Sequence, residues 1–184
     1  FFQTTTMIIS VPSVVILTAL FISLWGGSIR FNTPMLFALG FLPMFGIGGL
    51  TGLPLGLNIT DIPLHDTYYV IGHFHYIVAP GTIFALFAGI YYWFPKATGR
   101  MMNETLGKVH FWLSIIFMNG IFLPMLIQGM AGVSRRLYDG GATYDFAKPV
   151  LFWNEIMSIS AWYLALAQIP FLINFFGIWN ISSK

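Results

Sequence analysis

Three of the four histidines of this chain lie close together in a sequence that is otherwise largely apolar. His73 and His75 stand two positions apart, inside a segment with the character of a membrane-spanning helix. Each helical residue advances by about 100°, so the two side chains differ by about 200° and point to opposite faces. Histidines that share one metal ion on a helix are spaced i, i+4 on a common face. The spacing therefore predicts two separate cofactors, one on each side of the helix, with Phe74 between them.

Ionisable side chains within the hydrocarbon region are rare and mark functional sites. The alternative is a pair of structural histidines whose ring nitrogens bond to neighbouring helices. For two histidines on opposite faces, beside a glycine-rich segment, we favour ligation of haem iron, which commonly takes an axial histidine. His110 stands alone at the start of another apolar segment, and we expect it to be structural.

His65 and Asp66 precede the same helix at the membrane edge. An imidazole nitrogen and a carboxylate oxygen can bind a hard divalent cation such as magnesium or manganese. The alternative is a polar turn in which Asp66, or Thr67 in its place, caps the next helix; both interpretations can hold together. Asp61 is either a solvated acid or a partner in the same hydrogen-bond network.

Arg135 and Arg136 follow a later apolar segment. Guanidinium groups bind carboxylates in a bidentate manner, and haem propionates are paired carboxylates. A solvated basic pair at a membrane edge is the ordinary alternative. We expect propionate binding because this pair is predicted to lie on the same side of the membrane as His65 and Asp66.

The composition predicts the environment of these residues. Of 184 residues, 57% are hydrophobic and 8% are charged, whereas soluble domains carry roughly 25% charged residues. We therefore expect an integral membrane protein. The absence of cysteine excludes disulfides, zinc–thiolate sites and iron–sulfur clusters from this chain. The eight basic residues are dispersed rather than gathered in a stripe, which disfavours nucleic acid as a partner.

Five windows have the roughly 20 mostly apolar residues that a membrane span needs. They predict an all-α bundle of five transmembrane helices. The second window is rich in glycine, which lets neighbouring backbones or a flat ligand approach closely. The windows run roughly over residues 6–25, 34–55, 69–94, 106–129 and 152–178.

The charges of the loops predict the orientation, because Lys and Arg are in excess on the cytoplasmic side. The loops after the first and third windows and the C-terminus, with Lys184, carry five basic residues and one acidic residue. The N-terminus and the remaining loops carry three basic and five acidic residues. We expect the N-terminus outside and the C-terminus in the cytoplasm or matrix. The loops with His65 and Arg135 then share the outer face.

Taken together, these residues resemble the C-terminal part of subunit I of the haem-copper oxidases, the cytochrome c oxidase family. The string His65-Asp66-Thr67-Tyr68-Tyr69-Val70-x-x-His73-Phe74-His75-Tyr76 matches the tenth helix of that family. By this resemblance residues 1–184 form helices eight to twelve of a twelve-helix subunit. Further similar strings occur in the right order over nearly the whole chain: residues 26–29, 33–36, 48–52 and 135–136.

The resemblance implies a role for each candidate residue. His73 would be the proximal ligand of the oxygen-reducing, high-spin haem, and His75 an axial ligand of a low-spin haem. Phe74 would lie on an electron route between them. The outer residues would be a magnesium or manganese site at His65 and Asp66, and propionate contacts at Arg135, Arg136 and Asp61.

The family's three copper-ligand histidines, the second ligand of the low-spin haem and a cross-linked tyrosine have no counterpart in this chain. Copper would therefore be supplied by an N-terminal half of subunit I. A subunit divided into two polypeptides is the preferred explanation, and a segment of one long chain is the second. Other expected partners are further oxidase subunits, a cytochrome c or quinol donor, oxygen and lipid.

Ile16 stands where the family usually has a lysine that begins a proton pathway, with Ser13 where a hydroxyl is usual. An isoleucine cannot relay a proton, so we expect this route to be absent or rebuilt from Ser13, Thr18 and water. The lost lysine places proton pumping in question while leaving oxygen reduction possible.

The function that these observations favour is that of a terminal respiratory oxidase, which reduces oxygen to water in coupling with proton movement. The membrane would be a bacterial plasma membrane or the mitochondrial inner membrane. The alternatives are a nitric oxide reductase of the same superfamily, a non-catalytic haem-binding or assembly subunit, and a transporter whose histidines relay protons.

Overall fold

The computed structural model describes residues 1–180, and side chains through residue 178. Lys184, which entered the predicted orientation, lies outside the described residues. The described part is helical, with one isolated β-bridge and no strand. Five helical stretches are long and apolar enough to cross a membrane, which confirms the predicted fold class. They are α1 (Phe2–Leu24), α2 (Thr33–Gly56), Tyr68–Thr98, α6 (Glu104–Met130) and Lys148–Ile178.

Two of these stretches are composite. The third consists of α4 (Tyr68–Val78), a π-helical turn η1 (Ala79–Phe84) and α5 (Ala85–Thr98). Pro80 lies in the π-helical turn, and a proline cannot donate the backbone hydrogen bond that a regular α-helix needs. The fifth consists of η2 (Lys148–Val150), α7 (Phe152–Leu166) and α8 (Ile169–Asn180). A short helix, α3 (Asn58–Leu64), connects α2 to α4.

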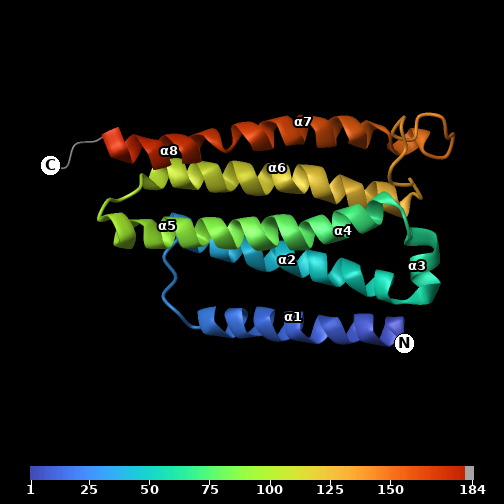
Figure 1. Cartoon of the computed structure of the whole chain (residues 1–184), viewed down its shortest axis with the longest axis horizontal. Helices are drawn as coiled ribbons and strands as arrows, with labels where there is room; N and C mark the ends of the chain where they lie inside the picture. Colours follow the sequence, from blue (N-terminus) through green and yellow to red (C-terminus); the bar gives the residue numbers. More distant parts are fainter. Residues whose placement is uncertain (181–184) are drawn as a thin grey trace.

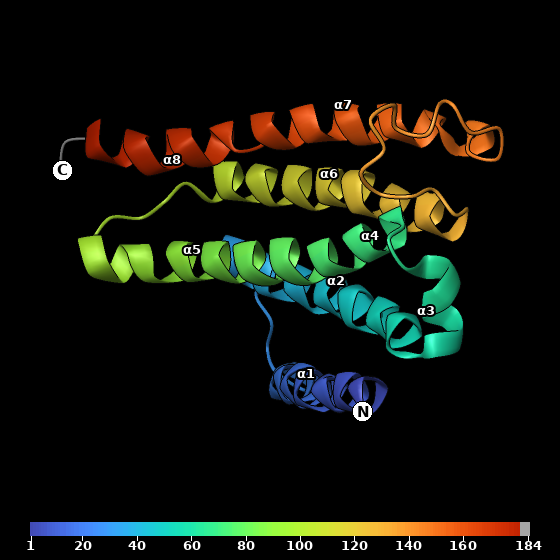
Figure 2. The ribbon, with the colours of Figure 1, turned by 45° about the vertical axis from the view of Figure 1, so that its right-hand side comes forward.

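The helices lie side by side, and α4–α5 packs between α2 and α6 (Figure 1). The continuous pair α7–α8 covers the far side of α6. In both ribbon views α1 is the outermost helix, joined to α2 by an extended link (Figure 2), and it packs against α2. None of its residues is buried. The N-terminus, α3 and the loop after α6 are at one end of the bundle, and the C-terminal end of α8 is at the other.

Glycine brings α4 and α6 into backbone contact. A Cβ atom built on Gly129 would overlap the backbone nitrogen of Tyr69, so no larger residue fits at this crossing. A Cβ atom on Gly72 would be 2.9 Å from the side chain of Leu126. Small residues commonly allow such close packing between membrane helices. These contacts hold the first turns of α4, which carry the histidine pair, against α6.

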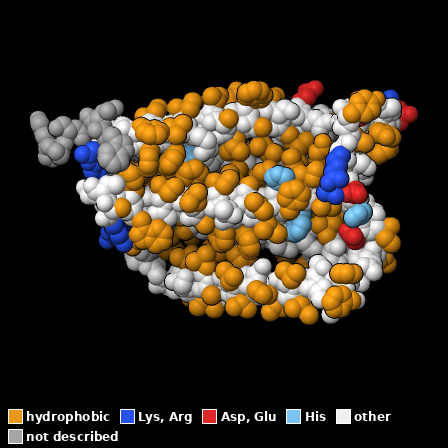
Figure 3. All heavy atoms as spheres, viewed as in Figure 1, with side chains coloured by type: hydrophobic (Ala, Val, Ile, Leu, Met, Phe, Trp, Pro, Cys, Tyr) orange, Lys and Arg blue, Asp and Glu red, His pale blue; other side chains and the backbone are white. Residues whose placement is uncertain are grey.

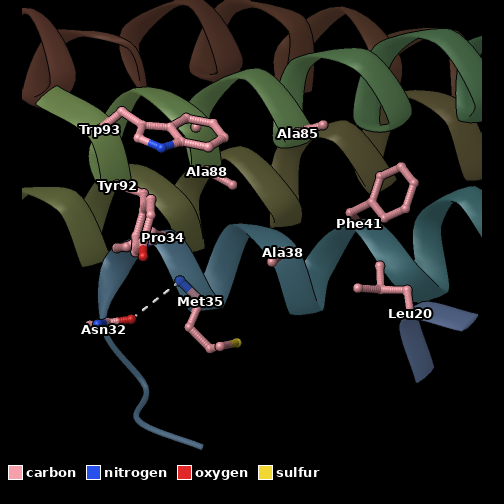
Figure 4. Close-up of a pocket in the computed structure, with 11 residues that line it drawn as sticks. Leu20, Asn32, Pro34, Met35, Ala38, Phe41, Ala85, Ala88, Tyr92 and Trp93 are labelled. Atoms are coloured by element: carbon pink, nitrogen blue, oxygen red, sulfur yellow. Dashed lines mark hydrogen bonds between the residues drawn. The ribbon is translucent and has the colours of Figure 1, made fainter. Parts of the chain in front are cut away.

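An apolar cavity of about 520 Å³ lies between α1, α2 and α5. Figure 4 shows Tyr92 and Trp93 of α5 on one side and the start of α2 on the other, where Asn32 accepts a hydrogen bond from the backbone of Met35. The cavity reaches along α5 to Ala85, twelve residues or about 18 Å of helix beyond His73. It is therefore separate from the histidine pair.

Candidate functional site

The ring of His73 lies against the glycine-rich face of α2. Its Nδ1 atom is 2.8 Å from the carbonyl oxygen of Gly48 and 3.2 Å from the hydroxyl oxygen of Thr51. A Cβ atom on Gly52 would be only 2.7 Å from Cε1 of the ring. Because a carbonyl only accepts hydrogen bonds, Nδ1 carries the proton and Nε2 keeps its lone pair. No hydrogen bond to this Nε2 occurs within residues 1–180.

The ring of His75 has the same protonation pattern but a different support. Its Nδ1 atom is 2.8 Å from the carbonyl oxygen of Ile71, one turn earlier in the same helix. The ring stacks on Phe122 of α6, with centroids 5.2 Å apart and planes at 29°. Phe74 is in contact on the other side, at 4.4 Å between centroids. In the described part of the chain, Nε2 of His75 also has no hydrogen-bond partner.

The two rings thus lie on different sides of α4, His73 toward α2 and His75 toward α6, as their spacing predicts. Phe74 stands between them in sequence and is 40% exposed. A neutral imidazole that donates Nδ1–H to a carbonyl and presents a free Nε2 is the form in which histidine binds metals. Both rings are only partly buried, so a planar ligand can reach each of them. The donors of this chain therefore fit two haems.

The loop before α4 is fastened to the loop after α6. Arg135 donates from Nε to the Asp66 carboxylate at 2.7 Å, and a second guanidinium nitrogen donates to the same oxygen. The backbone N–H of Arg135 donates to the carbonyl of Asp66 at 2.9 Å. An antiparallel bridge joins Thr67 to Ser134. The two loops share one end of the bundle, where acidic and histidine side chains gather on the visible face (Figure 3).

Of the two residues predicted to cap α4, Thr67 does so and Asp66 does not. Thr67 is the N-cap, and its hydroxyl oxygen accepts a hydrogen bond from the backbone of Tyr69 at 3.2 Å. Asp66 is in the left-handed region, with φ of 57°, and pairs with Arg135 instead. The hydrogen bond from Arg135 is the main cause that lowers the pKa of the Asp66 carboxyl below its usual value. Asp66 is therefore an anion in the link between the loops.

The predicted divalent-cation site is only partly assembled by this chain. Nε2 of His65 is 3.5 Å from a carboxylate oxygen of Asp66, and Nδ1 is 3.9 Å from one of Asp61. Within the described range no group of three histidine or acidic side chains could hold a metal ion. Magnesium is often held by one or two carboxylates with several waters. His65 and Asp66 therefore fit as part of such a site, with further ligands from elsewhere.

The two arginines differ in their surroundings. Arg135 is engaged by Asp66, whereas Arg136 is exposed and has φ of 66°. A guanidinium group has five N–H donors, of which Arg135 directs only Nε and one terminal nitrogen to Asp66. Its remaining donors and those of Arg136 are compatible with a second carboxylate.

His110 has the satisfied surroundings expected of a structural histidine. It is fully buried, with Nδ1 3.2 Å from the hydroxyl of Tyr91 and Nε2 3.1 Å from the side-chain oxygen of Gln168. Phe37 and Phe87 pack on the ring. Both ring nitrogens of His110 have partners, whereas in His73 and His75 only Nδ1 has one among the described residues.

The sequence reasoning did not identify the residues that support the two rings. Gly48 and Thr51 contact His73, and Phe122 contacts His75. The four-residue spacing of Gly48 and Gly52 was an available signal, since two small residues at this spacing commonly mark a close helix crossing in a membrane. Phe122 is one of 19 phenylalanines, and nothing in its local pattern distinguishes it.

Comparison with known proteins gives a consistent result over nearly the whole chain. Residues 1–164 match the family model described as "Cytochrome C and Quinol oxidase polypeptide I". The chain is 49% identical over 181 residues to cytochrome c oxidase subunit 1 of Thermostichus vulcanus, covering 98% of this chain and 32% of that protein. It is 41% identical over 172 residues to the subunit 1 of Yarrowia lipolytica, covering 94% and 31%.

A further relative is the alternative cytochrome c oxidase subunit 1 of Bradyrhizobium diazoefficiens, 40% identical over 181 residues, with 98% of this chain and 30% of that protein covered. The chain thus spans about a third of the length of the relatives it matches. The matched segment includes the histidine pair, the loop with Asp66 and the arginine pair. By these matches the chain belongs to the family of polypeptide I of the cytochrome c and quinol oxidases, an oxidoreductase family of haem-copper membrane proteins.

Proposed function

We propose that this chain is the haem-bearing segment of the catalytic subunit of a terminal respiratory oxidase. In the assembled enzyme, electrons from cytochrome c or a quinol reduce oxygen to water, and the reaction is coupled to proton movement. The observation that carries the proposal is the presence of two imidazoles on opposite sides of α4, each with Nδ1 bonded to a carbonyl and with no hydrogen bond to Nε2 among the described residues. The matched relatives are oxidases, which leaves the nitric oxide reductase alternative without support.

His73 would hold the high-spin haem and His75 the low-spin haem, each through Nε2. The haems supply one-electron redox chemistry and, at the high-spin iron, a site for oxygen. The chain's own contribution is orientation. The Gly48 carbonyl fixes the tautomer of His73 from α2, and the Ile71 carbonyl fixes that of His75 from α4. Phe74 would lie on the electron route between the two ligands.

At the outer end, Arg135, Arg136 and Asp61 would lie near the haem propionates, where guanidinium groups offset the propionate charge. Arg135 would then bridge a propionate and Asp66. His65 and Asp66 would contribute two ligands to a magnesium or manganese ion. The described loop contacts support this arrangement because they keep the arginines and the acidic loop together.

The remaining parts of the enzyme lie outside this chain. An N-terminal half of subunit I, on a separate chain or as the rest of a longer one, would supply copper and the second ligand of the low-spin haem. Other subunits and the electron donor complete the assembly. Ile16 is 61% exposed on α1, and its aliphatic side chain cannot relay protons. Proton delivery would therefore use another route than the family's lysine.

The test is made on the native complex purified from its membrane. Mass spectrometry of the subunits shows whether this segment is a separate chain. Reduced-minus-oxidised spectra are then recorded for His73→Ala and His75→Ala. We expect the first variant to lose the high-spin haem signal and the second to lose the low-spin signal. Gly46→Ala is the control, because a Cβ atom there has no atom within 4 Å. Retention of both haem signals in both histidine variants would refute the assignment.

A further inference from the structure

We infer that Thr51 is a positioning residue that sets the basicity of His73 by sharing the carbonyl oxygen of Gly48 with its ring. This inference rests on the proposed function, in which His73 is a haem ligand. The effect of Thr51 would pass through the hydrogen bond on the far side of the ring.

Gly48, Thr51 and His73 form a closed triangle of hydrogen-bonding atoms. The Gly48 carbonyl oxygen accepts from the Thr51 hydroxyl at 2.8 Å and from Nδ1 of His73 at 2.8 Å. The hydroxyl oxygen of Thr51 is itself 3.2 Å from Nδ1. Two members belong to α2 and the third to α4, so the triangle lies across the helix crossing.

The close approach of the two backbones makes this triangle possible. A Cβ atom on Gly48 would be 2.8 Å from Cγ1 of Ile77 and 3.0 Å from its backbone nitrogen. Only glycine allows α4 to come close enough for the ring of His73 to reach the carbonyl. The Thr51 hydroxyl is held over the same oxygen by its own bond to that carbonyl, three residues earlier in the helix.

A threonine that bonds to the carbonyl three or four residues earlier is ordinary in a helix. The unusual feature is that this carbonyl is also the acceptor for a candidate metal ligand. A second donor on the same oxygen reduces the charge that it offers to Nδ1–H. A weaker bond at Nδ1 gives the ring less anionic character and makes Nε2 a less basic ligand. Thr51 therefore moderates the donor strength of His73.

The same helix provides an internal comparison. Nδ1 of His75 bonds to the Ile71 carbonyl, and the hydrogen bonds of the described residues include no side-chain hydroxyl at that ring. A change at Thr51 should accordingly act on the ligand His73 and leave the ligand His75 unaffected.

The experiment uses the purified native complex with Thr51→Val, which removes the hydroxyl and keeps the shape, and Thr51→Ser, which restores the hydroxyl. Thr98→Val is the matched control, because the Thr98 hydroxyl bonds to the Phe94 carbonyl at 2.8 Å in a helix without a candidate ligand. The readouts are the iron–histidine stretching frequency of the reduced high-spin haem and the reduction potential of each haem.

With Thr51→Val, the Gly48 carbonyl is left to His73 alone. We expect a higher iron–histidine frequency and a lower potential at the high-spin haem, with an unchanged low-spin haem. Thr51→Ser and Thr98→Val should match the native complex. Unchanged frequency and potential in Thr51→Val, with the haem bound, would overturn the inference.

Three further outcomes distinguish failure of this inference from failure of the proposed function. If Thr51→Val loses the high-spin haem while Thr51→Ser retains it, the hydroxyl holds the ring in place rather than weakening its bond to the carbonyl, and the inference fails while the haem assignment stands. If both Thr51 variants lose it, packing rather than hydrogen bonding is responsible, and the inference fails while the haem assignment stands. If instead His73→Ala retains a native high-spin haem, the proposed function itself fails, and the role of Thr51 fails with it.

Discussion

His73 and His75 are two residues apart on one helix, yet the structure supports them in different ways. Nδ1 of His73 is held by a neighbouring helix, through the Gly48 carbonyl to which Thr51 also donates. Nδ1 of His75 is held by its own helix, and only its ring face depends on a neighbour, through Phe122. The first ligand therefore depends on the α2–α4 crossing and the second on the α4–α6 crossing. Substitutions beside one ring should therefore affect one haem, whereas a substitution that displaces α4 as a whole should affect both.

Gly129→Ala should have the largest effect. It should displace α4 as a whole and therefore affect His73 and His75 alike. The added Cβ atom would overlap the backbone of Tyr69, and no side-chain rotation can relieve a clash with backbone. The helices α4 and α6 must separate, at a cost of about 3 kcal/mol or more for overpacking. We expect a lower thermal unfolding midpoint of the complex and loss of both haems. Gly46→Ala should leave both measurements unchanged, and a native midpoint for Gly129→Ala would contradict the crossing described here.

Gly52→Ala should affect His73 alone. The new methyl group would be 2.7 Å from Cε1 and 3.3 Å from Nε2 of the ring, so the ring must turn away from its hydrogen-bond acceptor. Loss of a supporting contact typically reduces metal affinity about 10-fold or more. We expect a reduced high-spin haem content by pigment extraction and spectroscopy, with a normal low-spin signal. An equal loss of both haems would show that the α2–α4 crossing is not specific to His73.

Phe122→Leu should affect His75 alone, and more weakly. An aromatic contact of this kind contributes about 1 kcal/mol, while the bond of Nδ1 to the Ile71 carbonyl remains. We expect the low-spin haem to stay bound, with a shifted absorption maximum and potential, and the high-spin haem to be unchanged. The control is Phe176→Leu, since Phe176 is 61% exposed and has no contact with either ring. A shift of the high-spin haem instead would reverse the assignment of sides.

Local periodicity and length were sufficient to predict the helical class, the opposite faces of the histidine pair and the common end of the two polar loops. They could not predict which helix each ring contacts, because contacts such as that of His75 with Phe122 join residues far apart in sequence. Hydropathy windows also do not detect α3 or the π-helical turn at Pro80, since these change backbone hydrogen bonding without changing apolarity. The pairing of Asp66 with Arg135 was likewise beyond local pattern, which offered only capping or metal binding for Asp66.

The smallest effect is expected from Asp66→Asn, at the link between the loops before α4 and after α6. Because this link joins α4 to α6, it should influence His75 more than His73. Asp66 is exposed and Arg135 is partly buried, and pairs of this kind contribute little to stability because water and salt screen the two charges. Its acid dependence follows from the direction of the pKa change. Arg135 lowers the pKa of Asp66 below the ordinary value of 3.8, so the contribution is fully present above that value and is lost as pH falls through the lower, folded-state pKa.

Hydrogen exchange at the backbone amide of Arg135, which bonds to the carbonyl of Asp66, reports on this link. In the native chain we expect protection to persist as the pH falls through the ordinary aspartate value of 3.8 and to decline only at still lower pH. In Asp66→Asn the same amide should be less protected than in the native chain above the acid transition and equally protected below it, so that the variant shows no transition of its own. Asp145→Asn is the control, because within the described part of the chain Asp145 pairs with Lys148 of η2 and not with Arg135. A native transition near the ordinary aspartate pKa would show that Arg135 does not hold the carboxylate, and the α4–α6 side would then depend on Gly129 and Phe122 alone.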